Sequence, residues 1–523
     1  MPGHRWSRRR VLQAAGAIFA PMPLASAWAQ SDGAVKLLRA PKEALVIGNA
    51  AYRHVPTLVN PANDAKAIAA VLSEAGFKVH SVVDADRAAM LEAISAYVAG
   101  VGARKSVGLF YFAGHGVQLG WRNYLLPVDA AIARLEDVPG RCVDVTTLIE
   151  GIKRASNAMN VVILDACRDN PFGGEVRLEQ KGLSQMDAPS ATLLAYATAP
   201  GNMASDGRGA NGLYTENLVR EMRVPEARIE DVFKRVRLGV RLASKGAQIP
   251  WESTSLEEDF YFLPPAQLQK LSREQEERAF KEEREVFQGA RDSRDPAQLG
   301  GYLRRYPSGH FTELAQLLLD RALAAQGEKP VAIAPAEGNP NTQGSARADT
   351  SFKVGDHYAY LVRDLRLGGS DDRTIAQTVT AISDQEVVFN HGRLVIDPLG
   401  NAIKLPDGRH YTPRQDVPLE YVVGKRWSTR FDVIAGGQGT VDMDFRIVRR
   451  EKITVPAGTF DCFRVEGHGY SHSPFRPAPV ETFLTVWRAP QHVRRAIAHE
   501  EKRMMRGDTQ VWQRNELVSF VET

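Results

Sequence analysis

The sequence predicts an α/β domain built on a mostly parallel sheet flanked by helices, followed by a helical segment and an antiparallel all-β domain. Between residues 40 and 265, short apolar runs alternate with amphipathic stretches of helical spacing. Residues 266–325 are rich in charged, helix-forming residues, and in residues 351–523 apolar and polar residues alternate between turn residues. Strands that alternate with helices indicate parallel pairing, whereas strands separated only by turns indicate an antiparallel domain.

In the first domain the expected elements alternate along the chain. Residues 63–75 illustrate the helical pattern, because Ile68, Val71, Leu72 and Ala75 fall on one helical face. Strands are expected at 44–47, 79–83, 107–112, 161–164 and 193–197, and helices at 63–75, 86–98 and 144–155.

The remaining chain divides by composition. Residues 326–350 are rich in Ala, Pro, Gly, Asn and Ser, which predicts a flexible linker. In the last domain, 351–523, the alternation favours a curved sheet or barrel. That domain carries no recognisable catalytic motif, and its ligand or partner is unknown from sequence. The alternating stretches are 374–379, 386–390, 440–448 and 481–487.

The overall composition is typical of a soluble globular protein, with 44% hydrophobic and 24% charged residues in a chain of 523. The formal net charge of +4 falls to about zero once the arginines of residues 1–29 are removed. A mature protein without net positive charge has no long-range attraction to phosphate backbones, so we expect no nucleic-acid binding.

Residues 1–29 have the layout of a secretory signal peptide. An arginine run at 8–10 precedes an apolar stretch at 11–27, and Ala27-Trp28-Ala29 forms a small-x-small cleavage site before Gln30. The arginine run resembles a twin-arginine signal. We therefore expect a periplasmic or secreted protein, exported by the twin-arginine or general secretory route and without stable membrane insertion afterwards. A basic arm that contacts nucleic acid is the alternative interpretation.

The sequence contains three cysteines, Cys142, Cys167 and Cys462. A disulfide framework in an exported protein is usually denser and even in number, so at least one thiol stays unpaired within a monomer. Catalysis is one reason to keep a thiol in an oxidising compartment. Cys142 and Cys462 are readily interpreted as buried and inert.

Two of the expected strands run directly into reactive residues. Strand 107–112 leads into Ala113-Gly114-His115-Gly116, and strand 161–164 leads into Asp165-Ala166-Cys167. Functional groups of an open parallel sheet gather beyond the carboxyl ends of the strands, which share one edge. His115 and Cys167 are therefore expected in one crevice, and the glycines beside His115 are expected to form a sharp turn there.

This pair has the chemistry of nucleophilic catalysis. A thiol with an ordinary pKa is only a few per cent thiolate at neutral pH, and the thiolate is the nucleophile. A nearby imidazole such as that of His115 accepts the thiol proton and later protonates the leaving amine. The backbone N–H groups of Gly116 and Cys167 are the expected donors to the oxyanion.

A second Gly-His-Gly, at residues 467–469, lies six residues after Cys462. Six residues of extended strand span ~20 Å, which is beyond the reach of proton transfer. No Asp-x-Cys motif precedes Cys462, so this pair is not expected to act.

Together the two motifs resemble those of the caspase and metacaspase superfamily, in which a His in a Gly-His-Gly setting follows one strand and a Cys in an Asp-x-Cys setting follows a later one. A His about 50 residues before the Cys is a known property of caspases. The run Leu164-Asp-Ala-Cys-Arg-Asp-Asn-Pro171 is closer to bacterial caspase-like and metacaspase sequences. Further similar stretches extend over 44–263: 44–49, 58–64, 196–201, 204–207, 248–251 and 260–262. The resemblance implies a caspase-like fold and a cysteine endopeptidase with a His115–Cys167 dyad.

In metacaspase-like enzymes two acidic residues line the pocket for a basic side chain, and the resemblance assigns them to Asp64 and Asp165. It thus implies cleavage after Arg or Lys, held by charge-assisted bonds. Ala113 and Pro61 depart from the family pattern, which has a small polar residue and, in some relatives, a Cys. Structural roles at a helix N-terminus for Asp64 and in a turn for Asp165 are the alternatives.

The polar segment 173–190 is expected to be a surface loop that contains Arg177 and Lys181. An enzyme that cleaves after basic residues can cut itself there, as caspase-type domains do between their two halves. Protein or peptide substrates are the expected partners. No metal or cofactor is predicted, and a requirement for calcium stays open.

Two other functions fit the same residues. A catalytically silent scaffold would use the fold and the β domain to bind partners, but an intact His115 and Cys167 argue against it. Another cysteine hydrolase of similar layout, such as a relative of legumain or gingipain, would share the pair and differ in its pocket.

Export predicts that the mature protein begins at Gln30, because cleavage should follow Ala29. Protein purified from its native compartment should return Gln30 as its first residue on N-terminal sequencing. A native chain that begins at Met1 or Pro2 would contradict the signal-peptide interpretation.

Overall fold

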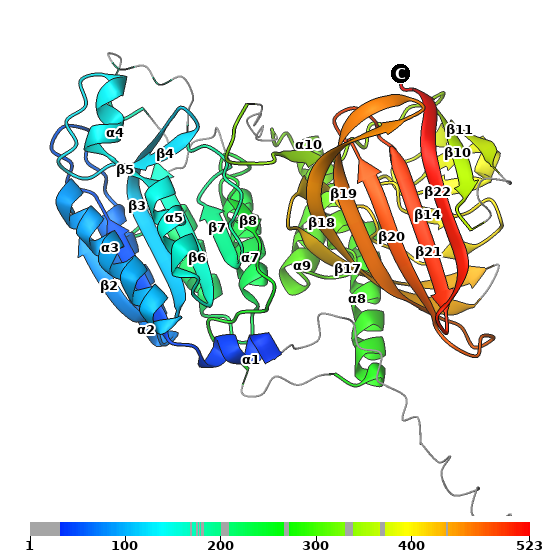
Figure 1. Ribbon diagram of the computed structural model, residues 1–523, viewed down its shortest axis with the longest axis horizontal. Helices are drawn as coiled ribbons and strands as arrows, with labels where there is room; N and C mark the ends of the chain where they lie inside the picture. Colours follow the sequence, from blue (N-terminus) through cyan, green and yellow to red (C-terminus); the bar gives the residue numbers. More distant parts are fainter. Residues whose placement is uncertain are drawn as a thin grey trace, which may run out of the picture.

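The computed structural model describes residues 32–523 apart from 168–169, 174–175, 177, 179–181, 200–208, 266–270, 330–337, 367–371 and 436–437. The predicted signal peptide therefore lies outside the described residues. Figure 1 shows an α/β domain and a β-barrel, with helices packed between them. None of the helices in the described part combines the length and the apolar character that a membrane-spanning helix requires.

The first domain is organised around one mixed sheet. Its strands are β1 (Lys42–Gly48), β2 (Lys78–Val83), β3 (Val107–Leu119), β4 (Arg122–Leu125), β5 (Val143–Asp144), β6 (Met159–Cys167), β7 (Thr192–Tyr196) and β8 (Trp251–Thr254). The main path is β2-β1-β3-β6-β7-β8, and β4 pairs with the far end of β3. All pairs from β2 to β7 are parallel, and β8 is antiparallel to β7. The expected mostly parallel sheet is confirmed.

Helices cover both faces of this sheet. They are α1 (Asp32–Arg39), α2 (Pro61–Glu74), α3 (Arg87–Arg104), α4 (Val138–Arg141, after a 3-10 turn at Leu135–Asp137), α5 (Val145–Ala155), α6 (Leu213–Met222) and α7 (Ile229–Ala243). Two starts are capped, since Asp86 accepts a bond from Ala89 N–H and Asp144 accepts one from Thr146 N–H.

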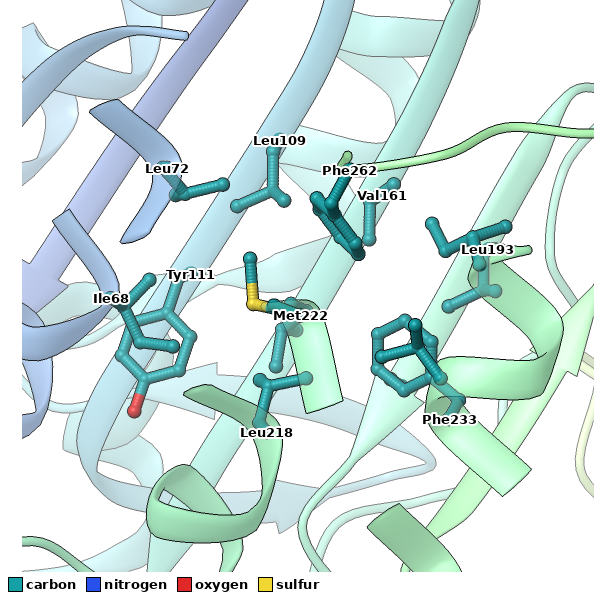
Figure 2. Close-up of a cluster of buried hydrophobic side chains, with 14 of the residues drawn as sticks. Ile68, Leu72, Leu109, Tyr111, Val161, Leu193, Leu218, Met222, Phe233 and Phe262 are labelled. Atoms are coloured by element: carbon teal, nitrogen blue, oxygen red, sulfur yellow. The ribbon is translucent and has the colours of Figure 1, made fainter. Parts of the chain in front are cut away.

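The alternation of strand side chains divides the core into two layers. Leu109 and Tyr111 of β3 point to the face covered by α2, α6 and α7, whereas Phe110 and Phe112 point to α3 and α5. Both layers are apolar because the strands are buried on both sides. Figure 2 shows the first layer, which includes Ile68, Leu72, Leu109, Tyr111, Val161, Leu218, Met222 and Phe233.

Strands β3 and β6 run further than the sequence indicated. The expected turn after residue 112 is absent, because β3 continues through His115 to Leu119 and its last part pairs antiparallel with β4. Likewise β6 continues through Asp165 to Cys167. The reactive residues therefore lie within the carboxyl-terminal ends of the strands. The glycines of β3 permit close packing in an extended strand, which replaces the sharp turn inferred from them.

The helical segment consists of α8 (Arg273–Ser293), α9 (Pro296–Arg305) and α10 (Thr312–Ala325). A capping box between Ser272 and Gln275 starts α8. Phe287 is fully buried and stacks on Phe311 with ring centroids 4.8 Å apart. The same cluster takes in Leu238 of α7 and Leu419 near the barrel, so the segment joins the two domains through a shared apolar core.

The C-terminal domain is a closed antiparallel barrel, as Figure 1 shows, which confirms the antiparallel all-β expectation. It closes where β10 pairs with β22. Its strands are β10 (His357–Asp364), β11 (Arg373–Ile382), β12 (Val387–Phe389), β13 (Leu394–Ile396), β14 (Ala402–Lys404), β15 (His410–Tyr411), β17 (Arg426–Ala435), β18 (Gly439–Val455), β19 (Gly458–His472), β20 (Val480–Arg488), β21 (Ala498–Met505) and β22 (Asp508–Val521). A 3-10 turn at Asn390–Gly392 and a separate pair of β9 (Ser345–Arg347) with β16 (Glu420–Val422) complete it.

Residues 338–347, inside the range for which the composition indicates a flexible linker, make specific contacts with the first domain. Asn339 Nδ2 donates to Ser184 Oγ at 2.9 Å, and Asp187 accepts bonds from Thr342 Oγ1 and Gln343 N. Asn123 of β4 in turn holds both the N–H and the carbonyl of Ser184. The same polar side chains that make this composition resemble a flexible linker form the hydrogen bonds with the first domain.

One ion pair links the first domain to the barrel side. Arg237 of α7 binds Glu420 of β16 with two bonds, of 2.9 and 2.7 Å, and both side chains are at most a quarter exposed. Burial raises the pKa of Glu420, but Arg237 and Lys425 outweigh it and lower that pKa to about 2. Arg237 also stacks over Trp251 at 5.5 Å.

Glu420→Gln should lower the free energy of unfolding by up to about 3 kcal/mol at neutral pH, because it removes the carboxylate that binds Arg237 with two bonds and leaves only the more distant Glu252, at 3.9 Å. A depressed folded-state pKa contributes stability above the unfolded value, near 4.5, and loses it as pH falls toward about 2. The difference in free energy of unfolding between the wild-type protein and Glu420→Gln should therefore shrink below pH 4.5. Urea titrations over a pH series measure this difference.

Glu74→Gln is the matched control, because Glu74 pairs with Arg223 at a site where both side chains are about half exposed. It should leave the unfolding midpoint unchanged at every pH. A Glu420→Gln gap that stays constant down to acid pH would contradict the role given to this carboxylate.

Candidate active site

Strands β3 and β6 bring His115 and Cys167 together. The two strands are parallel and in register from Val107 opposite Met159 to His115 opposite Cys167. Neighbouring strands lie about 4.8 Å apart, so the backbones of the two residues are adjacent. The side chain of Cys167 is outside the described part of the chain. The expected meeting of the two motifs is thus present at the level of strand register.

His115 is held rigidly, with only 4% of its surface exposed. Its Nε2 lies 2.8 Å from the carbonyl oxygen of Pro56, and its ring packs against Tyr52 with centroids 4.6 Å apart. A carbonyl oxygen can only accept, so Nε2 carries the hydrogen. In the neutral ring Nδ1 is then the nitrogen that accepts a proton.

The backbone around His115 sets the direction of the next N–H group. The His115 N–H donates to the Tyr52 hydroxyl, and its carbonyl accepts from Leu126 N–H. These bonds place both backbone groups of His115 on the side of Tyr52 and β4. Successive residues of a strand alternate in direction, so the Gly116 N–H points to the opposite side, toward β6.

Gly114 is required for this packing. A Cβ at position 114 would lie 2.5 Å from the Tyr52 hydroxyl and 3.2 Å from the carbonyl oxygen of Asn49, and the residue has a φ of +154°. Asn49 is itself fully buried and bonds Ala85 and Leu126 through its side chain. Gly114 therefore lets the loop after β1 approach β3 closely, which brings Tyr52 onto His115.

Asp165 lies on the face of the sheet that α2 and α6 cover. Its Oδ2 accepts a bond of 2.7 Å from the Thr215 hydroxyl and one of 3.1 Å from the Tyr111 hydroxyl. Thr215, in the first turn of α6, and Tyr111, on β3, lie 2.6 Å apart and are both buried. Three elements thus fix the orientation of this half-buried carboxylate.

Asp64, in the first turn of α2, is 3% exposed. Its Oδ1 accepts bonds of 2.9 Å from the Asn211 side chain and from the Gly212 N–H, just before α6. Burial raises the pKa of Tyr111 well above its usual value, and the charges of Asp165 and then Asp64 raise it further. Asp64 bonds Gly212, which immediately precedes α6, and Asp165 bonds Thr215 in the first turn of α6, so both carboxylates lie beside the start of the same helix.

Sequence reasoning missed the residues that orient the site. Tyr52 and Pro56 act through a hydroxyl and a carbonyl, and nothing in the local pattern of residues 50–58 marks them. Thr215 and Asn211 belong to a helix start far along the chain. A Thr in the first turn of a helix after a polar, glycine-containing loop was the only available signal, and it is a weak one.

The other cysteines and the second Gly-His-Gly motif are not part of this site. Burial raises the pKa of the Cys142 thiol and of the Cys462 thiol to about 12 each, which agrees with their interpretation as inert. His468 bonds Glu481 within the barrel wall. Arg177 and Lys181, expected in a self-cleavage loop, lie outside the described residues. Among the described residues, no group of three or more His, Cys, Asp or Glu side chains is arranged to hold a metal ion.

Comparison with known proteins agrees with the fold of the first domain. Residues 41–261 match the model of the caspase domain family. A human protein, mucosa-associated lymphoid tissue lymphoma translocation protein 1, is 28% identical over 181 residues, which are 34% of this chain and 21% of the human protein. Its mouse homologue is 27% identical over the same length. The match spans about a fifth of these relatives. The first domain is therefore similar to caspase domains and has the mostly parallel, helix-flanked sheet of their fold.

Proposed function

We propose that this protein is a cysteine endopeptidase in which Cys167 is the nucleophile and His115 is the general base. The observation that carries the proposal is the register of β3 and β6, which sets His115 opposite Cys167 at the carboxyl ends of two parallel strands. The bond from Nε2 to Pro56 supports it, because it leaves Nδ1 as the proton acceptor.

In this reaction His115 Nδ1 takes the thiol proton, and the Cys167 thiolate attacks the carbonyl carbon of the scissile peptide bond. The carbonyl oxygen becomes an oxyanion. When the C–N bond breaks, the imidazolium returns its proton to the leaving amine and an acyl-enzyme remains. Water, deprotonated by the same ring, then displaces the thiolate and releases the acid. The carbonyl oxygen of Pro56 accepts the hydrogen bond from His115 Nε2–H during both formation and hydrolysis of the acyl-enzyme, and so stabilises the imidazolium.

The oxyanion requires N–H donors that already point at it. The Gly116 N–H is directed toward β6, because the neighbouring His115 groups are used on the side of Tyr52 and β4. We assign it as one donor, with the Cys167 N–H as the second. Loss of one such donor typically costs two to three orders of magnitude in turnover.

We further propose that Asp64 and Asp165 bind the basic side chain before the scissile bond. Their support is that both contact the start of α6, Asp64 through the Gly212 N–H and Asp165 through the Thr215 hydroxyl. Thr215 and Asn211 fix their positions before substrate arrives. A recessed pair of carboxylates favours a guanidinium or ammonium through charge-assisted bonds and disfavours an acidic side chain.

Cys167→Ala and His115→Ala should each lower peptide hydrolysis by at least ~100-fold, because each removes one half of the nucleophile–base pair. The measurement is kcat/KM on fluorogenic peptides, with circular dichroism to show that the variants fold. Cys462→Ala and His468→Ala are the matched controls, because they change the second Cys and the second Gly-His-Gly, and they should keep full activity. Turnover retained in either dyad variant would show that the pair is misassigned.

Asp64→Asn and Asp165→Asn should each weaken cleavage of Arg peptides roughly 10- to 150-fold in kcat/KM, since each removes a charge-assisted bond of ~1.5–3 kcal/mol. A positional scan should favour Arg and Lys over Asp before the scissile bond. Asp86→Asn, which retains the α3 cap on the other face of the sheet, should leave both readouts unchanged.

The two proposals fail separately. A scan that favours Asp would overturn the acidic pocket and leave the dyad standing. If Asp64→Asn and Asp165→Asn lowered kcat/KM equally for Arg peptides and for uncharged peptides, the two acids would hold the structure of the site and would not recognise the basic side chain.

A further inference from the structure

The barrel carries a partly open pocket of about 220 Å³, lined by barrel residues and not by the peptidase motifs. A row of register partners crosses its wall, from Val465 on β19 to Val486 on β20, His499 on β21 and Asn515 on β22. Register partners lie on the same face of a sheet, so these four side chains point inward together. The cavity is therefore built into the strand register of the barrel.

Two arginines, Arg488 and Arg495, line this cavity. Arg488 donates to the carbonyl of Arg494, and Arg495 donates to Gln377 Oε1 at 3.1 Å and lies over Phe389. Within the described part of the chain, no carboxylate lies within 4.0 Å of either guanidinium. Buried cations are normally paired, because an uncompensated charge in a partly enclosed space is costly.

The two guanidiniums act on each other and on their neighbours. Burial lowers the pKa of Arg495, and the charge of Arg488 lowers it further, against the opposing effect of Tyr360. Burial also lowers the pKa of His499; Glu501 opposes this shift and Arg488 adds to it. Like charges that face one space without a counter-ion leave that space at positive potential.

The carboxylates near the cavity are already matched by other arginines. Asp416, which lines it, is bound by Arg414. Glu501 is bound by Arg503 at 2.7 Å, and Glu516 by Arg514 at 2.9 Å. Because these carboxylates are already paired with other arginines, the charges of Arg488 and Arg495 are the uncompensated ones.

The rest of the lining is largely apolar. It includes Ile375, Ala402, Val417, Pro418, Leu484 and Val486, beside the polar Tyr360, Gln377 and Asn515. A volume of 220 Å³ is roughly that of seven water molecules at ~30 Å³ each, so it suits a compact ligand. A lining that combines two arginines with apolar side chains matches a ligand that has an anionic head and a small apolar body.

We propose that the barrel binds a small organic carboxylate, with its head between Arg488 and Arg495 and its body against Val486 and Leu484. A planar guanidinium fork matches a carboxylate in two-bond geometry, and two forks match it on both oxygens. Such a carboxylate can belong to a free small acid or to the C-terminal residue of a peptide. This binding does not depend on the peptidase activity proposed for the first domain.

The test is isothermal titration of the full-length protein with benzoate and with the neutral analogue benzamide. Saturable binding of benzoate without binding of benzamide is expected, because only the acid satisfies the two guanidiniums. A second arm compares acetyl-Gly-Leu with its C-terminal amide. Binding of benzoate assigns a free acid as the ligand, and binding of the peptide acid alone assigns a peptide C-terminus.

Arg488→Gln and Arg495→Gln should each weaken the carboxylate that binds by roughly tenfold or more. Neither should lower the thermal midpoint of the ligand-free protein, since each relieves repulsion between unpaired like charges. Arg449→Gln is the matched control: Arg449 is a half-exposed barrel arginine paired with Glu451, and its loss should leave binding unchanged.

Three outcomes would overturn the proposal. The first is no binding of either acid, and the second is equal binding of acid and amide. The third is unchanged affinity in both Arg488→Gln and Arg495→Gln together with a lowered midpoint, which would make the two arginines structural. Because every readout is binding or stability, failure here leaves the peptidase proposal untouched, and loss of hydrolysis in the dyad variants leaves this one untouched.

Discussion

The candidate active site depends on the register between two parallel strands, β3 and β6. Parallel pairing places the ends of both strands at one edge, and the register sets His115 opposite Cys167 at that edge. A shift of one residue would move every side chain of one strand to the other face. The buried alternation of Leu109 and Tyr111 against Phe110 and Phe112 prevents such a shift, because either strand would then turn its core residues to the wrong layer. The packing of core residues several positions before His115 therefore keeps His115 opposite Cys167.

Much of the first domain could be predicted from the sequence because its signals are local. Apolar strands and amphipathic helices follow from spacing, and the positions of His115 and Cys167 follow from the strands that precede them. The continuation of β3 to Leu119 could not be predicted, because Gly114 and Gly116 are typical of a turn when their neighbours are unknown. Tyr52 and Thr215 reach the site from distant segments, and such contacts have no local pattern.

For the barrel, the sequence predicted the type of strand pairing but not the closure of the sheet. Alternation predicted antiparallel strands, and it does not distinguish a closed barrel from an open curved sheet, because closure depends on the pairing of β10 with β22. A strand that alternates apolar and charged residues is usually interpreted as having its charged side in water. Arg488 and His499 belong to such strands, yet they line a partly open pocket of the barrel. Only the three-dimensional register reveals that these side chains line one pocket.

The contacts of residues 338–347 have a mechanical consequence for the first domain. The stretch around Ser184 and Asp187 is held from two directions, by Asn123 of β4 and by the polar groups of Asn339, Thr342 and Gln343. If the backbone were severed between Cys167 and Gly182, residues 338–347 and the barrel would belong to the downstream fragment. That fragment would still contact the upstream one through the bonds of Ser184 with Asn123 and of Asn341 with the carbonyl of Trp121. Strands β7 and β8 would remain seated beside β6. The molecule would then behave as two polypeptides joined without a covalent bond, held together by the pairing of β6 with β7 and by these polar contacts.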